Sequence, residues 1–149
     1  FSGRLNEEKI KPIRELWKGK LVLKGVACEA DVKEAIRLGI DGVIVSNHGG
    51  RQLDAGESTI KPLKTIAEKY GNQIEVMMDS GIRSGPDVAR SLASGAKFTF
   101  MGRSFMYGVA ALGKKGGNHT ISLLKTELQQ VMEQLCCENI EDLPNFLVK

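Results

Sequence analysis

The sequence predicts an α/β fold of the (β/α)8-barrel type, of which this chain forms half, with about four strand–helix units followed by a C-terminal helix. Two observations support this prediction: short apolar runs alternate with amphipathic helical patterns, and part of the chain repeats after 56 residues. The length of 149 residues adds a third, because a complete barrel of this kind needs about 250 residues.

Four short apolar runs predict the strands. These runs lack the polar alternation of a half-exposed antiparallel strand, as expected for parallel strands that are covered on both faces. We therefore expect parallel strands at residues 21–23, 43–45, 74–78 and 98–101.

Amphipathic helical patterns separate and flank these runs. Three of them end close to a glycine, at Gly39, Gly71 and Gly95, as helices with a glycine C-cap do. An opening helix is expected near residues 10–17 and a closing helix near residues 121–135. The order of a helix, four strand–helix units and a final helix favours a parallel sheet with right-handed crossovers.

An internal repeat identifies the kind of parallel sheet. Gly25 matches Gly81 and Gly39 matches Gly95, each pair 56 residues apart. Each copy reads as a strand, a glycine turn, a helix, a glycine-capped exit and a second strand. Tandem units of this kind are common in (β/α)8 barrels and less so in open sheets. We therefore interpret residues 1–149 as half of a barrel.

Composition argues against several classes of protein. A net charge of +3 and 5% aromatic residues give little support for nucleic-acid binding. No apolar run approaches the roughly 18–20 residues that cross a bilayer, and no signal peptide opens the chain. Three cysteines without metal-ligand spacing predict no metal site and a reducing compartment. We expect a cytoplasmic protein, with peripheral attachment to the inner membrane as the alternative.

The first residue, Phe1, is not an initiator methionine. We therefore expect the sequence to start inside a longer polypeptide.

A histidine and an arginine share the longest of the loops that follow the predicted strands. Ligands of parallel α/β folds bind at this edge of the sheet. Histidine is the usual general base near neutral pH, and arginine can bind a carboxylate through two parallel hydrogen bonds. We therefore predict that His48 is catalytic and that Arg51, three residues later, binds substrate. The alternative is a solvated loop whose histidine bonds to backbone.

A lysine ends the first predicted strand. An unpaired ammonium at the end of a buried strand is energetically costly. Lys24 is therefore expected either to contact an anionic ligand or to pair with a carboxylate on a neighbouring strand, such as Asp79.

The turns after the third and fourth strands combine glycine with arginine. Gly81 precedes Arg83, and Gly102 precedes Arg103. Glycine lets backbone N–H groups approach a phosphate, and the following helix N-terminus adds positive potential. In a complete barrel these loops follow strands seven and eight, where phosphate often binds. We predict a phosphate site; the alternative is arginines that pair with acids on the helices.

The segment Ser46–Asp54 resembles the active-site signature of the FMN-dependent α-hydroxy-acid dehydrogenases and oxidases, a family that includes glycolate oxidase and L-lactate dehydrogenase. The similarity continues through residues 23–25, 79–85 and 102–107 and covers essentially the whole chain. It implies that residues 1–149 form the C-terminal half of such a barrel. It further implies FMN as cofactor and oxidation of an L-2-hydroxy acid to the 2-keto acid.

The resemblance also implies roles for the residues that position singled out. His48 is expected to be the general base and Arg51 to bind the substrate carboxylate. The residues implied in FMN binding are Lys24 at the N1/O2 edge of the flavin, Ser46 at the flavin, Asp79 at the ribityl chain, and Gly81, Arg83, Gly102 and Arg103 at the phosphate.

The chain departs from the family pattern in two ways. Ser80 replaces the more usual glycine, a small change on a turn that we expect to be tolerated. The family's first half supplies a substrate-binding tyrosine, a second arginine and the aspartate that orients the histidine, and the resemblance does not extend to it. A second hypothesis is therefore an inactive half-barrel that binds FMN or phosphate weakly, or that only self-associates through its open sheet edges.

The resemblance also bears on the partners. It implies a small 2-hydroxy acid as substrate and a homo-oligomer, as in the tetramers of the family. The electron acceptor stays open among oxygen, a quinone and a cytochrome.

Overall fold

Four parallel strands form one sheet in the computed structural model, which describes residues 5–148. The strands are β1 (Val22–Val26), β2 (Gly42–Val45), β3 (Glu75–Met78) and β4 (Phe98–Thr99). Their order in the sheet is β1-β2-β3-β4, and every neighbouring pair is parallel. Consecutive strands are also neighbours around a (β/α)8 barrel. The predicted parallel α/β arrangement is therefore confirmed.

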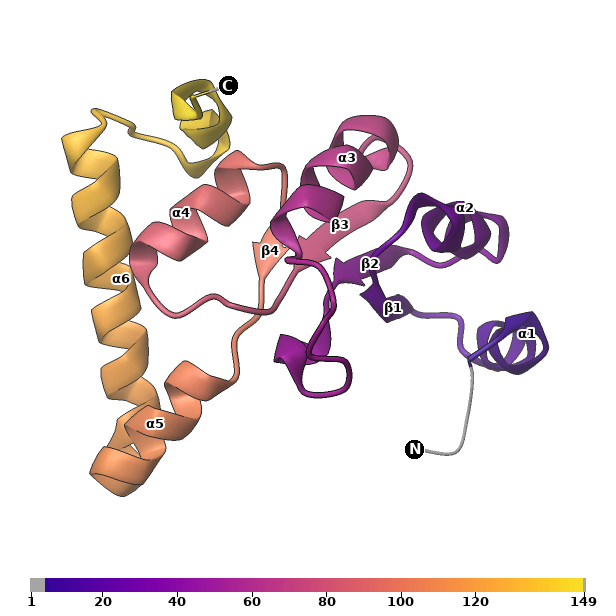
Figure 1. Cartoon of the computed structure of the whole chain (residues 1–149), viewed down its shortest axis with the longest axis horizontal. Coiled ribbons are helices and arrows are strands. Elements are labelled where there is room, and N and C mark those ends of the chain that lie inside the picture. Colours follow the sequence, from indigo (N-terminus) through magenta and orange to yellow (C-terminus); the bar gives the residue numbers. More distant parts are fainter. Residues whose placement is uncertain (1–4, 149) are drawn as a thin grey trace.

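Helices connect the strands and flank the sheet. Figure 1 shows α1 to α4 in chain order, forming an arc outside the strands, with the long α6 beyond α4. The predicted order of a helix, four strand–helix units and a final helix is confirmed. The bounds are α1 (Glu7–Leu16), α2 (Glu29–Arg37), α3 (Ile60–Tyr70), α4 (Gly85–Ala93), α5 (Arg103–Leu112) and α6 (Gly116–Gln134), with 3₁₀ segments η1 (His48–Gly50), η2 (Gly113–Lys115) and η3 (Ile140–Phe146).

The core lies where the sheet meets its helices. Every residue of β2 is buried, because this strand has a neighbour on each side and helices over its face. Val32 of α2 and Leu63 of α3 are fully buried in the same cluster as Val43 and Val45. Burying an aliphatic side chain of this size contributes about 1.5–3 kcal/mol. The apolar stripes of the helices therefore hold the strands that carry the loops.

Several elements begin or end at residues other than those predicted. Strand β4 was expected at residues 98–101 but stops at Thr99, because only two of its residues pair with β3. Strand β1 was expected to end at residue 23 but continues to Val26, since a bulge at Gly25 lets it stay paired with β2. The closing helix, expected from residue 121, already begins at Gly116.

The internal repeat has the same backbone geometry in both copies. Gly25 and Gly81 have φ values of +95° and +77°, and Gly39 and Gly95 have values of +71° and +102°. Glycine adopts these angles without the strain that a Cβ imposes. The matching glycines therefore mark the same helix end in each copy and lie near the carboxyl end of a strand, with Gly25 inside β1 and Gly81 just after β3.

The sheet has open edges in the part of the chain that the structure describes. β1 and β4 each have one neighbouring strand. Phe98 and Phe100 lie beside each other at the β4 edge, with ring centroids 5.0 Å apart, and both are exposed. Unpaired strand edges with exposed apolar side chains are typical of surfaces that bind further protein. Within residues 5–148, no helix has both the length and the apolarity to cross a membrane.

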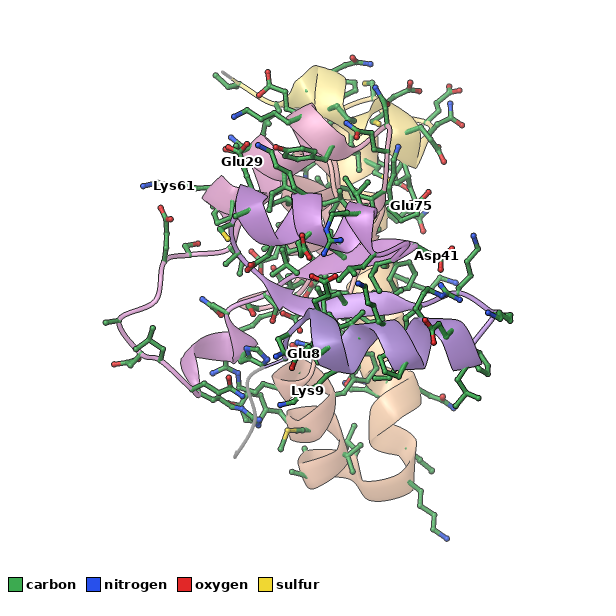
Figure 2. The ribbon with its side chains drawn as sticks, turned by 90° about the vertical axis from the view of Figure 1, so that its right-hand side faces the viewer. Glu8, Lys9, Glu29, Asp41, Lys61 and Glu75 are labelled. Atoms are coloured by element: carbon green, nitrogen blue, oxygen red, sulfur yellow. The ribbon has the colours of Figure 1, made fainter. Side chains whose placement is uncertain are left out.

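The two ends of the strands face opposite sides of the molecule. In Figure 2, Asp41 and Glu75, at the amino ends of β2 and β3, lie on one side. Glu29 and Lys61, at the starts of α2 and α3, lie on the opposite side. The segments that follow the strands therefore gather on the side of Glu29 and Lys61.

Candidate active site

A cleft of about 300 Å³ opens at the carboxyl ends of the strands. Four cationic side chains and one carboxylate line it, so that positive charge predominates and anionic ligands are favoured. The lining comes from β1 and from the segments after β2, β3 and β4: Lys24, His48, Gly49, Arg51, Asp79, Ser80, Gly81, Ile82, Arg83, Phe100, Met101, Gly102, Arg103 and Met106.

Eight of the nine site residues predicted from the sequence line this one cleft. The exception is Ser46, which was expected to contact the flavin. The residue is only 2% exposed, and its hydroxyl accepts from Nζ of Lys24 and from the backbone N–H of His48, two residues that line the cleft. Ser46 therefore supports residues of the lining rather than forming part of it.

Lys24 pairs with the carboxylate that the sequence analysis named as its alternative partner. Its Nζ lies 2.5 Å from Oδ2 of Asp79 and donates to Oγ of Ser46 at 3.0 Å. The β-bulge at Gly25 interrupts the strand beside Lys24, and such bulges re-aim side chains. Lys24 is still 45% exposed and lines the cleft, so an anionic ligand can also contact it.

Several side chains donate hydrogen bonds to the carboxylate of Asp79. Burial raises the pKa of Asp79, but hydrogen bonds from Lys24, Ser46 and Ser80 outweigh burial and hold this pKa below its ordinary value. The side chain therefore remains ionised at neutral pH and stays an acceptor.

His48 lies in a strained part of the loop between β2 and α3. The φ values are +56° at His48, +69° at Gly49 and +73° at Gly50. A left-handed backbone costs roughly 1–2 kcal/mol at a residue with a Cβ, and such strain clusters at functional sites. The backbone N–H of His48 donates to Oγ of Ser46 at 3.1 Å, which helps to hold the loop in this conformation.

The His48 imidazole packs against a glycine of β1. A Cβ added to Gly25 would lie 2.8 Å from Cε1 of His48. This distance is shorter than Cβ contacts in real proteins. Gly25 is therefore required for two reasons. Its positive φ fits the bulge, and its missing side chain leaves the space that the imidazole occupies.

The turn after β4 leaves backbone groups available. Helix α5 begins after Gly102 without a side-chain cap, whereas α4 has a capping box. Gly102 has a φ of −117°, and a Cβ there would meet nothing within 4 Å. Neither backbone strain nor packing among the described residues explains why this residue is glycine. At the α5 N-terminus this glycine leaves room for an anion to approach the backbone N–H groups.

Two arginines stand beside this helix start. The guanidinium of Arg83 has no ion-pair partner among residues 5–148, and the residue is exposed. Nη2 of Arg103 donates to the carbonyl oxygen of Gly49 at 3.1 Å. Arg103 therefore connects the start of α5 to the loop that carries His48.

Sequence analysis missed two residues that hold the His48 loop. Oδ1 of Asn47 accepts from the N–H of Gly49 at 3.0 Å, an Asx turn that asparagine before a turn favours. Ser80 was treated as a tolerated change, yet its hydroxyl bonds to this loop. Spacing along the chain gave no signal for that contact, because Ser80 lies on a different turn.

Comparison with known proteins gives matches over the whole chain. The family model for FMN-dependent dehydrogenase matches residues 1–149. An L-lactate dehydrogenase of Bartonella tribocorum is 42% identical over 142 residues, covering 90% of this chain and 37% of the relative. An L-lactate dehydrogenase of Alcaligenes faecalis is 39% identical over 148 residues, covering 99% of this chain and 39% of the relative. The chain thus spans about two fifths of the length of these relatives.

Solved structures agree with these matches. A mandelate oxidase with benzoyl-formic acid has a TM-score of 0.89 and 35% identity, covering 93% of this chain and 42% of that one. A soluble mutant of the membrane-associated (S)-mandelate dehydrogenase from Pseudomonas putida has a TM-score of 0.88 and 40% identity, covering 93% and 39%. These similarities confirm the predicted fold class, a partial (β/α)8 barrel.

Proposed function

The chain belongs to the FMN-dependent dehydrogenase family, and from this premise we propose that it contributes to FMN-dependent oxidation of an L-2-hydroxy acid to the 2-keto acid. One observation carries the proposal. A histidine, four cations and an open helix N-terminus, contributed by four successive parallel strands and the segments after them, line a single cleft. A base, a carboxylate-binding arginine and a phosphate site are the groups that this reaction requires.

The residues present fit FMN. The phosphate is proposed to bind the N–H groups at the start of α5, with Arg83 and Arg103 as counter-charges and Gly81 and Gly102 leaving room. Lys24 is proposed to lie at the flavin edge that becomes negative on reduction, where a cation stabilises that charge. Asp79 is proposed to accept from hydroxyls of the ribityl chain through its ionised carboxylate.

The proposed substrate chemistry uses the loop between β2 and α3. Oxidation of a 2-hydroxy acid removes two electrons and two protons, one proton from the carbon next to the carboxylate and one from its hydroxyl group. Bound FMN would take up the two electrons together with one of these protons. Arg51, which lines the cleft, is proposed to hold the substrate carboxylate with two parallel hydrogen bonds. His48 is proposed to accept a proton at one nitrogen of its imidazole.

Exposed apolar side chains and the cysteines bear on the partners and the location of the protein. Exposed apolar side chains on α5 and α6, such as Tyr107 and Leu123, support association with further protein, and we propose a homo-oligomer. All three cysteines are free thiols, which supports a reducing compartment such as the cytoplasm. The electron acceptor is proposed to be oxygen, a quinone or a cytochrome.

Flavin titration tests the proposal. Purified protein is titrated with FMN while flavin fluorescence is followed, and L-lactate is then added without oxygen while the flavin absorbance is recorded. We expect saturable FMN binding and bleaching by L-lactate but not by D-lactate. The variant His48→Gln should retain FMN, and its flavin should bleach at a rate at least about 100-fold lower. Failure to bind FMN, or equal bleaching by the variant, contradicts the proposal.

A second candidate function is favoured by the open sheet edges. Exposed Phe98 and Phe100 beside the unpaired edge of β4 support a half-barrel that only binds FMN or associates with itself. Both functions predict association, which sedimentation velocity over a range of concentrations measures, so bleaching by a 2-hydroxy acid is what separates the two. A stable oligomer that binds FMN and is never bleached by a 2-hydroxy acid supports this second function.

A further inference from the structure

The hydroxyl of Ser80 makes three hydrogen bonds that join two loops. It accepts from the backbone N–H of Asn47 at 3.2 Å and from that of Gly49 at 3.1 Å. It donates to Oδ1 of Asp79 at 2.8 Å. A serine hydroxyl has one hydrogen to donate and two lone pairs that accept. The capacity of the Ser80 hydroxyl is therefore fully used in this arrangement.

The two N–H groups that donate to the Ser80 hydroxyl belong to the residues on either side of His48. Holding both neighbours fixes the backbone around His48, in a stretch where three successive residues have positive φ. The N–H of Gly49 has a second acceptor in Oδ1 of Asn47, but that of Asn47 bonds only to Ser80 among the residues described. Without the hydroxyl, the amino-terminal side of His48 loses this anchor.

The backbone of Ser80 itself indicates that the side chain matters. Its φ is +78°, an angle that glycine adopts without strain and serine does not. A serine at this position is therefore less favourable for the turn than a glycine, and its hydroxyl bonds offset that strain.

Ser80 also connects the His48 loop to the ion pair at the base of the cleft. Asp79 uses Oδ1 to accept from Ser80 and Oδ2 to pair with Lys24. One hydroxyl therefore connects the Asp79 carboxylate to the backbone on both sides of His48.

We propose that Ser80 is a positioning residue, whose hydroxyl sets the place of His48 relative to the Lys24–Asp79 pair. Its effect on the reaction rests on the proposed function, in which His48 is the base. Its effect on the loop does not, because that effect rests only on the hydrogen bonds from Asn47 and Gly49 to the Ser80 hydroxyl.

Amide hydrogen exchange, measured by NMR, tests the positioning directly. In Ser80→Gly, which relieves the strained φ, and in Ser80→Ala, which keeps it, exchange at the N–H of Asn47 should be about fivefold faster or more. The N–H of Gly71, which bonds to Ala67 at a helix end, should exchange as before. The control Ser122→Ala removes an exposed hydroxyl on α6 and should change neither.

The imidazole signals supply a second readout. The chain has two histidines, and His119 lies on α6. In both Ser80 variants the Cε1–H signal of His48 should shift or broaden while that of His119 stays in place. Unchanged exchange at Asn47 together with an unchanged His48 signal in both variants overturns the inference.

Flavin reduction separates this inference from the proposed function. If wild-type protein is bleached by L-lactate, the kcat of both Ser80 variants should be at least about tenfold lower, with little change in KM. An unchanged kcat overturns the positioning role. If wild-type protein binds FMN but is not bleached, the proposed function fails, and the exchange and imidazole signals alone decide whether Ser80 positions the loop.

Discussion

The ammonium of Lys24 lies 2.5 Å from the carboxylate of Asp79, so that an ion pair joins β1 to the end of β3 over the intervening strand β2. The hydroxyl of Ser46, at the end of β2, accepts from the same ammonium. The Asp79 side chain is 16% exposed and that of Lys24 is 45% exposed. This partly buried pair forms the base of the cleft and connects three of its four strands.

We predict that Lys24 and Asp79 stabilise the fold through a coupling of about 1 kcal/mol, the upper end for partly exposed pairs. A double-mutant cycle with Lys24→Met and Asp79→Asn, measured by urea unfolding at pH 7, gives this coupling. Pairing Asp79→Asn with Lys64→Met, an exposed lysine on α3, is the control and should give no coupling. Equal values for the two cycles would show that the ion pair contributes nothing.

The coupling should depend on pH. The folded-state pKa of Asp79 lies below its ordinary value of 3.8, so the carboxylate contributes its stability in full above about pH 4. The contribution is lost as the pH falls through the lowered folded-state pKa. The same cycle measured below pH 3 should therefore give a smaller coupling than at pH 7. A coupling that does not change with pH would contradict the ionic origin.

We predict that Gly25→Ala displaces His48 and destabilises the protein by about 1–2 kcal/mol. The methyl group would enter the space of the imidazole, at 2.8 Å from Cε1, and the φ of +95° is unfavourable for alanine. Urea unfolding measures the stability, and the Cε1–H signal of His48 reports the displacement. Gly117→Ala, in α6 with nothing within 4 Å of the added Cβ, is the matched control and should be neutral or stabilising. If both variants behave alike, the close approach does not matter.

We predict that Arg83→Gln weakens FMN binding at least about tenfold, because the variant lacks the guanidinium that makes a charge-assisted hydrogen bond to the phosphate in the proposed complex. Riboflavin, which has no phosphate, should bind the variant and the wild type equally. Fluorescence titration with both ligands gives the comparison. Arg90→Gln is the control, since Arg90 pairs with Asp87 on α4 and does not line the cleft. Equal losses for FMN and riboflavin would place Arg83 away from the phosphate.

The strands and the gathering of site residues could be predicted because both depend on local patterns. The β2 run from Gly42 is apolar throughout, and the next polar residues necessarily follow it at the carboxyl edge of the sheet. The positive φ angles of Gly25 and Gly81 could likewise be expected from their matching places in the repeat.

The contacts between loops could not be predicted in this way. Ser80 bonds to the N–H groups of Asn47 and Gly49, more than 30 residues away in the chain, and only the packing of adjacent strands determines that distance. Ser46, which directly follows the central strand β2, is buried and lies outside the lining of the cleft, and its place in the sequence did not indicate this. Local pattern identifies the edge of the sheet, whereas side-chain direction at that edge depends on the neighbouring strands.

A last prediction concerns Asp41, which joins α1 to the amino ends of β1 and β2. Its Oδ2 accepts from Nη1 of Arg14 and from the backbone N–H of Leu21, both at 2.9 Å. Its Oδ1 lies 3.1 Å from Nζ of Lys20. The N–H of Leu21, followed by Lys20 and Arg14, lowers the pKa of Asp41 from 3.8 to about 2, against a smaller opposing effect of burial.

Asp41→Asn should lower the melting temperature by a few degrees at pH 7 and leave FMN affinity unchanged, since Asp41 lies on the opposite side of the molecule from the loops after the strands (Figure 2). Because the folded-state pKa is lowered, the carboxylate stabilises the fold fully above about pH 4, and this contribution is lost as the pH falls toward 2. The melting temperature of the variant should therefore decline less steeply than that of the wild type over this interval. Glu75→Gln, an exposed change on the same side, should follow the wild-type curve. Parallel curves for Asp41→Asn and wild type would mean that the Asp41 contacts do not depend on its charge.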